Sequence, residues 1–170
     1  MQVNSIGFRI VTAAITSIAA LLLATSPAQA ETTFYVNDNC DVSWITCSYG
    51  DLNVNYNTMQ YGLTSDGHLL TSYASFYGNV PDYAGASRYE GSSLVTYVYV
   101  FGNGGNGNGQ RMKNNAGSVW NCAPEDNYRI YYNSGYVGHS QYIRNAYYGS
   151  CYWTDLDSTL HDQNASQHWA

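Results

Sequence analysis

Hydrophobic and polar residues alternate in short runs along the chain, and clusters of turn-forming residues separate the runs. The clearest runs are β-branched and aromatic, as strands prefer, and they cover residues 34–36, 52–56, 94–101, 128–132 and 141–143. After residue 30, no segment keeps apolar residues at the helical spacing i, i+3, i+4 and i+7 for three turns. The pattern predicts an all-β protein, a sandwich or a barrel.

One segment within this pattern, residues 101–109, contains almost only glycine and asparagine. Glycine loses more conformational entropy on ordering than any other residue, so the segment predicts a flexible loop. A phosphate-binding loop is disfavoured, because neither a Lys-Ser/Thr pair nor a helical pattern follows the glycines.

The first thirty residues predict a signal peptide. Arg9 is the only charged residue in 1–30, residues 10–24 are mostly apolar, and residues 28–30 have the small–x–small form that signal peptidase cleaves. The apolar core is shorter than the roughly 20 residues that span a bilayer. We therefore expect cleavage after Ala30, secretion of residues 31–170 to the extracellular space, and no membrane association after cleavage.

The charge of the mature region limits its partners. Residues 31–170 hold five basic and twelve acidic residues, a net charge of −7. A nucleic-acid-binding protein needs a basic face to neutralise phosphates, so nucleic acid and anionic membranes are excluded as partners, and we expect a monomer. All 18 tyrosines lie in this region. They either fill strand faces or lie on the surface, where tyrosine binds sugars or proteins at a low entropic cost.

Four cysteines in an exported chain predict two disulfides. Their spacings are wider than the C-x2–4-C pairs of zinc sites. Short loops close most readily, so we expect the pairs Cys40–Cys47 and Cys122–Cys151. A cross-link between the two halves of the chain stays open as an alternative.

The chain also repeats itself. Each half contains an aromatic run that ends in Tyr-Asn-Ser/Thr, followed by a closing Asn-Ala and a tryptophan. At a shift of 76, Trp44, Val54, Tyr56 and Asn57 meet Trp120, Ile130, Tyr132 and Asn133; at a shift of 49, Asn115, Ala116 and Trp120 meet Asn164, Ala165 and Trp169. The repeat predicts one domain over 31–170 made of two related motifs, about 40–120 and about 121–170, with an insertion in the first that includes 101–109.

The second half resembles a known motif. The spacing Tyr131-x4-Tyr136-x-Gly138 resembles the Greek-key signature of βγ-crystallins, aromatic–four–aromatic–one–Gly, and segments 114–118 and 162–166 resemble the Asn/Asp…Ser segments that close such motifs. The first half keeps neither the aromatic spacing nor the glycine. The resemblance implies a βγ-crystallin-like Greek-key sandwich built from two related motifs.

A narrower resemblance concerns function. Residues 119–122, 131–141 and 164–169 resemble small secreted bacterial proteins grouped with a peptidase-inhibitor family whose founding member inhibits metalloproteinases. It implies a secreted, non-catalytic inhibitor of a peptidase, a metallopeptidase being one candidate. The 40–47 loop is the expected contact, with Trp44 as an aromatic anchor and Asp41 as an oxygen that approaches a catalytic zinc. Alternatively, Trp44 belongs to the core, as its repeat partner Trp120 suggests.

The βγ-crystallin resemblance also implies oxygen ligands for calcium: Asn114, Asn115, Ser118, Asp162 and Ser166. Among these ligands only Asp162 is charged, so any calcium site should be weak, about millimolar. Alternatively these side chains only cap turns. We expect no other cofactor.

Catalytic motifs are absent from the sequence. The four histidines are dispersed, and neither His-Glu-x-x-His nor Gly-x-Ser-x-Gly occurs. We therefore expect a protein that is not an enzyme. The alternative to an inhibitor is an extracellular structural or binding module for weak calcium, a glycan or the cell wall.

Overall fold

The computed structural model describes residues 31–40, 42, 51–62, 70–146 and 149–170. Within this part of the chain there are ten strands and one four-residue helix, α1 (Met59–Gly62), which confirms the all-β prediction. None of the helices found there is long and apolar enough to cross a membrane. The strands are β1 (Thr32–Val36), β2 (Leu52–Asn55), β3 (Tyr73–Phe76), β4 (Ala86–Glu90), β5 (Ser93–Tyr99), β6 (Ser118–Asn121), β7 (Tyr128–Asn133), β8 (Val137–Ile143), β9 (Tyr152–Asp155) and β10 (Ser166–Trp169).

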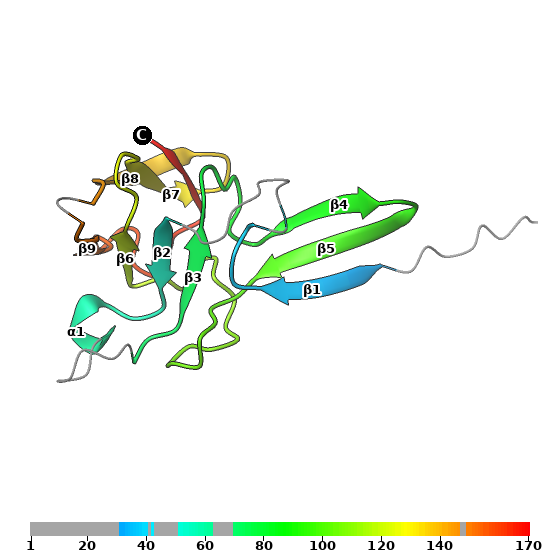
Figure 1. Ribbon diagram of the computed structural model, residues 1–170, viewed down its shortest axis with the longest axis horizontal. Helices are drawn as coiled ribbons and strands as arrows, with labels where there is room; N and C mark the ends of the chain where they lie inside the picture. Colours follow the sequence, from blue (N-terminus) through cyan, green and yellow to red (C-terminus); the bar gives the residue numbers. More distant parts are fainter. Residues whose placement is uncertain (1–30, 41, 43–50, 63–69, 147–148) are drawn as a thin grey trace, which may run out of the picture.

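Two antiparallel sheets form the body of the molecule (Figure 1). The first has the order β3-β2-β6-β9 and the second the order β10-β7-β8. Val80 extends the second sheet beyond β10, because its N–H donates to the Gln167 carbonyl at 2.9 Å and its carbonyl accepts from the Gln167 N–H at 3.0 Å. Each sheet therefore combines strands of one half of the chain with one segment of the other half.

This strand order is a Greek-key arrangement. In the second half the fourth strand, β10, lies beside the first, β7, while the third strand, β9, joins the other sheet. In the first half β6 lies beside β2, and the Val80 segment joins the other sheet. The predicted Greek-key sandwich is confirmed.

The core lies between the two sheets. Alternate residues of a strand point to opposite faces, and the inward positions hold large apolar residues. Leu52 and Val54 of β2, Val119 of β6, and Tyr128 and Ile130 of β7 are all fully buried.

The spacing Tyr131-x4-Tyr136-x-Gly138 forms a folded hairpin between β7 and β8. The rings of Tyr131 and Tyr136 lie 6.2 Å apart in an edge contact, and Tyr136 has a φ of 67°. Gly138 has a φ of 88°, and a Cβ there would lie 2.9 Å from Nδ2 of Asn133. The left-handed backbone favours glycine here, and a larger residue would also displace the end of the Asn133 side chain. The first half has α1 and a longer connection between β2 and β3, as its departure from the signature requires.

The two motifs also correspond at their closing segments. The Ser118 hydroxyl donates to the Asn57 carbonyl at 2.7 Å, and the Ser166 hydroxyl donates to the Asn133 carbonyl at 2.6 Å. The asparagines are 76 apart, as the sequence repeat predicts, but the serines are 166 − 118 = 48 apart. The sequence shift of 49, which aligned the Asn-Ala pairs and the tryptophans, therefore differs by one residue from the shift of 48 between the serines that bind the equivalent turns.

The prediction of a flexible 101–109 loop is wrong. Asn106 donates its N–H to the Leu70 carbonyl at 2.7 Å and accepts from the Ser72 N–H at 2.9 Å. A Cβ on Gly105 would lie 2.6 Å from the backbone of Thr71. The glycines therefore allow this loop to lie directly against the neighbouring backbone, and these hydrogen bonds offset the entropy of ordering.

Candidate functional site

Three strands form an arm that projects from the sandwich (Figure 1). β5 is the central strand, and it pairs in parallel with β1 and antiparallel with β4. We call β1, β4 and β5 the arm. Its two faces differ in burial, and this difference defines the candidate site.

The inner face of the arm continues into the core. Tyr97 is 8% exposed and stacks on Phe34 with 5.7 Å between the ring centroids. Its hydroxyl donates to Glu90 Oε1 at 2.6 Å, and the Arg88 guanidinium lies 5.0 Å from the Tyr97 ring centroid. The hydrogen bonds from Tyr97 and Arg88 lower the pKa of the Glu90 carboxyl. Arg88 also donates to the Val42 carbonyl at 2.8 Å, so this face is occupied by the protein itself.

The opposite face, which we call the outer arm face, is largely exposed and holds one carboxylate, that of Glu31, which accepts from the Thr96 hydroxyl at 3.0 Å. Register and strand alternation place on it Thr33, Tyr35, Ser87, Tyr89, Leu94, Thr96 and Val98, of which Val98 is buried. Tyr35 is 65% exposed and Tyr89 is 66% exposed. The hydroxyls of Ser87 and Thr96 lie 2.9 Å apart and bond to each other. The face can offer aromatic surface and hydroxyl groups to a ligand.

The residues implied as calcium ligands fall into two closing segments. In the first, Asn114 has a φ of 61°, and Asn115 uses its side-chain N–H to bond the Arg111 carbonyl at 2.8 Å. Ser118 is buried, and its hydroxyl, besides donating to a turn carbonyl, accepts from Asn55 Nδ2 at 3.2 Å. These side chains therefore already serve as backbone and turn caps.

The second closing segment is arranged in the same way. Asp162 has a φ of 55°, and one of its carboxylate oxygens lies 3.3 Å from Nδ1 of His161. The hydroxyl of Ser166 accepts from the Tyr136 N–H at 3.1 Å. The two segments contact each other through Asn164, which accepts from the Ala116 N–H at 2.9 Å.

A cleft of about 260 Å³ lies where the first motif's turn meets the second closing segment. It is slightly smaller than the roughly 300 Å³ at which drug-sized ligand pockets begin, so its size suits one small ring. Its lining residues are Tyr56, Asn57, Thr58, Tyr61, His161 and Asp162.

The histidines of the described segments make separate contacts. His139 Nε2 lies 2.7 Å from Asp157 Oδ2, and His168 Nε2 lies 2.6 Å from the Tyr131 hydroxyl. Burial raises the pKa of Asp157, but the hydrogen bonds from His139 and from the N–H groups of Thr159 and Leu160 outweigh it, and the net pKa is lowered. Among the residues that the structure describes, no three His, Cys, Asp or Glu side chains are grouped to hold a metal ion.

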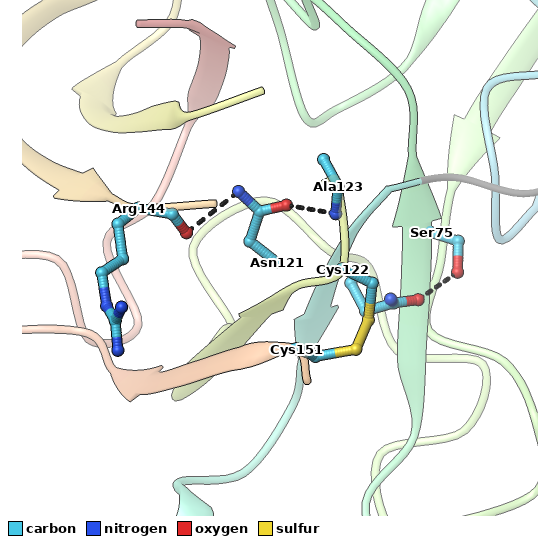
Figure 2. The surroundings of a disulfide bond; sticks show 7 residues. Ser75, Asn121, Cys122, Ala123, Arg144 and Cys151 are labelled. Atoms are coloured by element: carbon cyan, nitrogen blue, oxygen red, sulfur yellow. Dashed lines mark hydrogen bonds between the residues drawn. A yellow bond between two sulfur atoms is a disulfide. The ribbon is translucent and has the colours of Figure 1, made fainter. Parts of the chain in front are cut away.

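The Cys122–Cys151 disulfide is present, as predicted. It joins the ends of β6 and β9, one position beyond the pair Asn121–Tyr152 (Figure 2). Beside it Asn121 accepts from the Ala123 N–H at 2.9 Å and donates to the Arg144 carbonyl at 3.1 Å. Disulfides are typical of oxidising compartments.

The predicted inhibitory loop cannot be placed. Asp41, Trp44 and Cys47 lie outside the described residues, and so do the signal peptide and the Cys40–Cys47 pairing. Trp120, the repeat partner of Trp44, lies on the outer side of the first sheet. Its neighbour Val119 points into the core, so by strand alternation Trp120 points away from it. The Trp120 ring centroid lies 4.1 Å from that of Trp153.

Comparisons with known proteins show no family. No protein-family model matches the chain, and no curated protein matches it. A solved structure from work on the evolution of the eye lens beta-gamma-crystallin domain fold is similar, with a TM-score of 0.42 and 17% identity over 73% of this chain and 88% of that chain. The strand order described above, rather than this similarity, identifies the protein as a βγ-crystallin-like Greek-key sandwich.

Proposed function

We propose that the protein is secreted and binds another protein without catalysis, as an inhibitor of a peptidase, with a metallopeptidase as one candidate target. The observation that carries this proposal is the outer arm face, where Tyr35 and Tyr89 are about two-thirds exposed. Between them the Thr96 hydroxyl donates to the Glu31 carboxylate at 3.0 Å. Tyrosine is enriched in protein interfaces, where its exposed ring supplies most of the contact. The sequence resemblance to a peptidase-inhibitor family supports the choice of target.

The arm also suits a binding role energetically. Tyr35 and Tyr89 lie on opposite edge strands, and their partners on β5, Val98 and Leu94, are four residues apart. Strand spacing and rise then separate the two tyrosines by roughly 16 Å, which is wide enough to cover the centre of an interface. Because both side chains project from a paired sheet, little backbone entropy is lost on binding.

The test is a panel of secreted metallo-, serine and cysteine peptidases, assayed with residues 31–170 for inhibition and for binding by calorimetry. Tyr89→Ser should weaken binding to the target at least tenfold. Tyr132→Ser, at the end of β7 and 39% exposed, is the matched control and should change binding less than twofold. Failure of the parent protein to bind any peptidase would contradict the proposal.

The 40–47 loop stays a separate predicted contact. The variants Asp41→Ala and Trp44→Ala, each checked for folding, show whether this loop takes part in inhibition. Unchanged inhibition in both variants would remove this loop from the mechanism and leave the arm as the contact.

A second candidate function is a glycan- or calcium-binding module, and the cleft beside α1 is the observation that favours it. Two tyrosines beside a carboxylate and an amide suit a single sugar ring, since a site of this kind combines stacking with a few polar groups. Titration of the protein and of its Tyr61→Ala variant with monosaccharides tests whether this cleft binds sugar. No binding at millimolar sugar would reject it.

A further inference from the structure

The cleft of about 260 Å³ beside α1 carries a charge that a neutral sugar would not use. Among the described residues that line it, Asp162 supplies the one carboxylate, and there is neither lysine nor arginine. The protein around the cleft is itself acidic, with a net charge of −7 over residues 31–170. The cleft and its surroundings therefore favour a positively charged ligand over a neutral or an anionic one.

The Asp162 carboxylate can accept further hydrogen bonds. Its Oδ2 lies 3.3 Å from Nδ1 of His161, which is beyond the usual range of a hydrogen bond from nitrogen. No described residue donates to its Oδ1, and the side chain is 56% exposed. Because a carboxylate has about four acceptor positions, most of those on Asp162 are open to a ligand.

Two tyrosines supply aromatic rings to the same cleft. Tyr61 lies in α1 and is 68% exposed, so its ring is accessible. Tyr56 is held in place, because its ring makes an edge contact with Phe101 at 5.5 Å between the centroids and a Cβ on Gly107 would clash with it. Tyrosine rings attract cations to their faces, so the rings and the carboxylate favour the same kind of ligand.

The remaining polar groups of the cleft suit hydroxyls. The side-chain oxygen of Asn57 already accepts from Asn106 Nδ2 at 3.1 Å, so its side-chain nitrogen is left as a donor. The hydroxyl of Thr58 has no partner among the described residues, and a hydroxyl can both donate and accept. The first motif's turn therefore offers groups that bind sugar hydroxyls, and the second closing segment, through Asp162, offers the charge.

We propose that the cleft binds an amino sugar, a hexosamine whose free amino group is protonated. The ammonium group donates to Asp162, the sugar ring stacks on Tyr61, and the ring hydroxyls bond to Asn57 and Thr58. The cleft volume of about 260 Å³ suits one such ring. This inference rests on the second candidate function, that the cleft binds a sugar, and it is independent of peptidase inhibition.

The experiment compares three sugars that differ only at one ring carbon. Glucosamine carries an ammonium group there, N-acetylglucosamine a neutral amide, and glucose a hydroxyl. In NMR titrations of residues 31–170 at neutral pH, glucosamine should bind with a millimolar dissociation constant. The other two sugars should bind at least threefold more weakly, because an exposed ion pair and a cation–π contact are each worth a few-fold in affinity. The preference should shrink in about 1 M salt, which screens exposed charges.

A glucosamine trimer distinguishes the two sources of such a ligand. If the trimer binds more tightly than the monomer, the ligand is a unit of a chain. If the trimer binds more weakly, the ligand is the free sugar. Either result supports the inference as long as binding depends on Asp162.

Single substitutions assign the preference to the carboxylate. Asp162→Asn removes the charge but keeps a side chain that tolerates the left-handed backbone at this position, where φ is 55°. It should bring glucosamine within twofold of glucose. Glu125→Gln is the matched control, because it removes one negative charge at an exposed position on the β6–β7 connection, and it should leave the preference unchanged. Tyr61→Ala should weaken the binding of all three sugars.

The outcomes separate this inference from the functions proposed above. Equal binding of the three sugars would overturn the inference and leave the sugar-binding function. A preference for glucosamine that survives in Asp162→Asn, or shifted amides that all lie away from residues 57–61 and 161–162, would also overturn the inference. No binding of any sugar at millimolar concentration would reject the second candidate function and the inference together, and it would leave peptidase inhibition unaffected.

Discussion

Gln167 connects the two halves of the sandwich, and replacing it should reveal how strongly they depend on each other. This side chain is fully buried in β10. Its amide donates to the Gly78 carbonyl at 2.9 Å, and its carbonyl oxygen accepts from the Tyr83 hydroxyl at 2.6 Å. Burial, and then the neighbouring Tyr128, raise the pKa of Tyr83 well above its usual value, so its hydroxyl remains a donor across the accessible pH range.

The expected loss in the free energy of unfolding follows from the two groups that lose their hydrogen bonds to Gln167. Gln167→Met keeps the volume but leaves the Gly78 carbonyl and the Tyr83 hydroxyl buried without these partners. Each orphaned group costs about 1–3 kcal/mol, so the expected loss in the free energy of unfolding is about 2–6 kcal/mol. Tyr83→Phe orphans only one oxygen and should cost about 1–3 kcal/mol. The double variant, Gln167→Met with Tyr83→Phe, has no Tyr83 hydroxyl left to orphan. It should therefore be no less stable than Gln167→Met alone.

The assay is urea unfolding followed by tryptophan fluorescence, with the midpoint and the slope fitted together. Gln163→Met, at an exposed position three residues before Ser166 of β10, is the matched control and should stay within about 0.5 kcal/mol of the parent. A loss below about 0.5 kcal/mol for Gln167→Met, or strictly additive losses in the double variant, would refute the buried bridge.

Four further predictions follow from single features. Replacing Cys122 and Cys151 by alanine frees a loop with a sequence separation of 29, so the urea midpoint should report a loss of about 3.6 kcal/mol from loop-closure entropy; a loss under about 1 kcal/mol contradicts this. Asp157→Asn should cost about 1 kcal/mol at neutral pH. Because the folded pKa of Asp157 is lowered, that difference should be present above about pH 4 and shrink as the pH falls through the folded pKa; a constant difference down to pH 2 speaks against it. Gly138→Ala and Gly135→Ala should each cost roughly 1–2 kcal/mol of left-handed strain, because Gly135 has open space around its Cβ position and only the end of the Asn133 side chain has to move at Gly138; a cost below about 0.5 kcal/mol at both would contradict this. Calorimetry should find calcium binding no tighter than about millimolar, and micromolar affinity would show that the closing segments are a metal site.

Local patterns in the sequence predicted the fold where the determinants are close together in the chain. The hairpin from Tyr131 to Gly138 was predictable because a left-handed residue, a glycine and an aromatic pair lie within eight residues. By contrast β3, β6, β9 and β10 have only four residues each, too few to show a period. The ordered 101–109 loop was missed because Asn106 bonds to Leu70 and Ser72, 106 − 70 = 36 and 106 − 72 = 34 residues away.

The outer arm face could not be predicted from the sequence, because it is formed by strands that are far apart in the chain. Tyr35 and Tyr89 share a face only because β1 pairs in parallel with β5, at the register Thr32–Val95. A parallel pair needs a long crossover, and no turn signal marks its register. The signal that could have been followed is the alternation of hydroxyl-bearing residues at Thr33 and Tyr35, and again at Ser87 and Tyr89.

The central claim is that the arm is the surface that binds the proposed partner, and chemical-shift mapping tests this claim most directly. Isotope-labelled residues 31–170 are titrated with the peptidase that the panel selects, and the shifted backbone amides are assigned. The account predicts that the largest changes fall on β1, β4 and β5, with Thr33, Tyr35 and Tyr89 among them. Changes confined to the cleft beside α1 or to the outer side of the first sheet, with the arm unaffected, would contradict it.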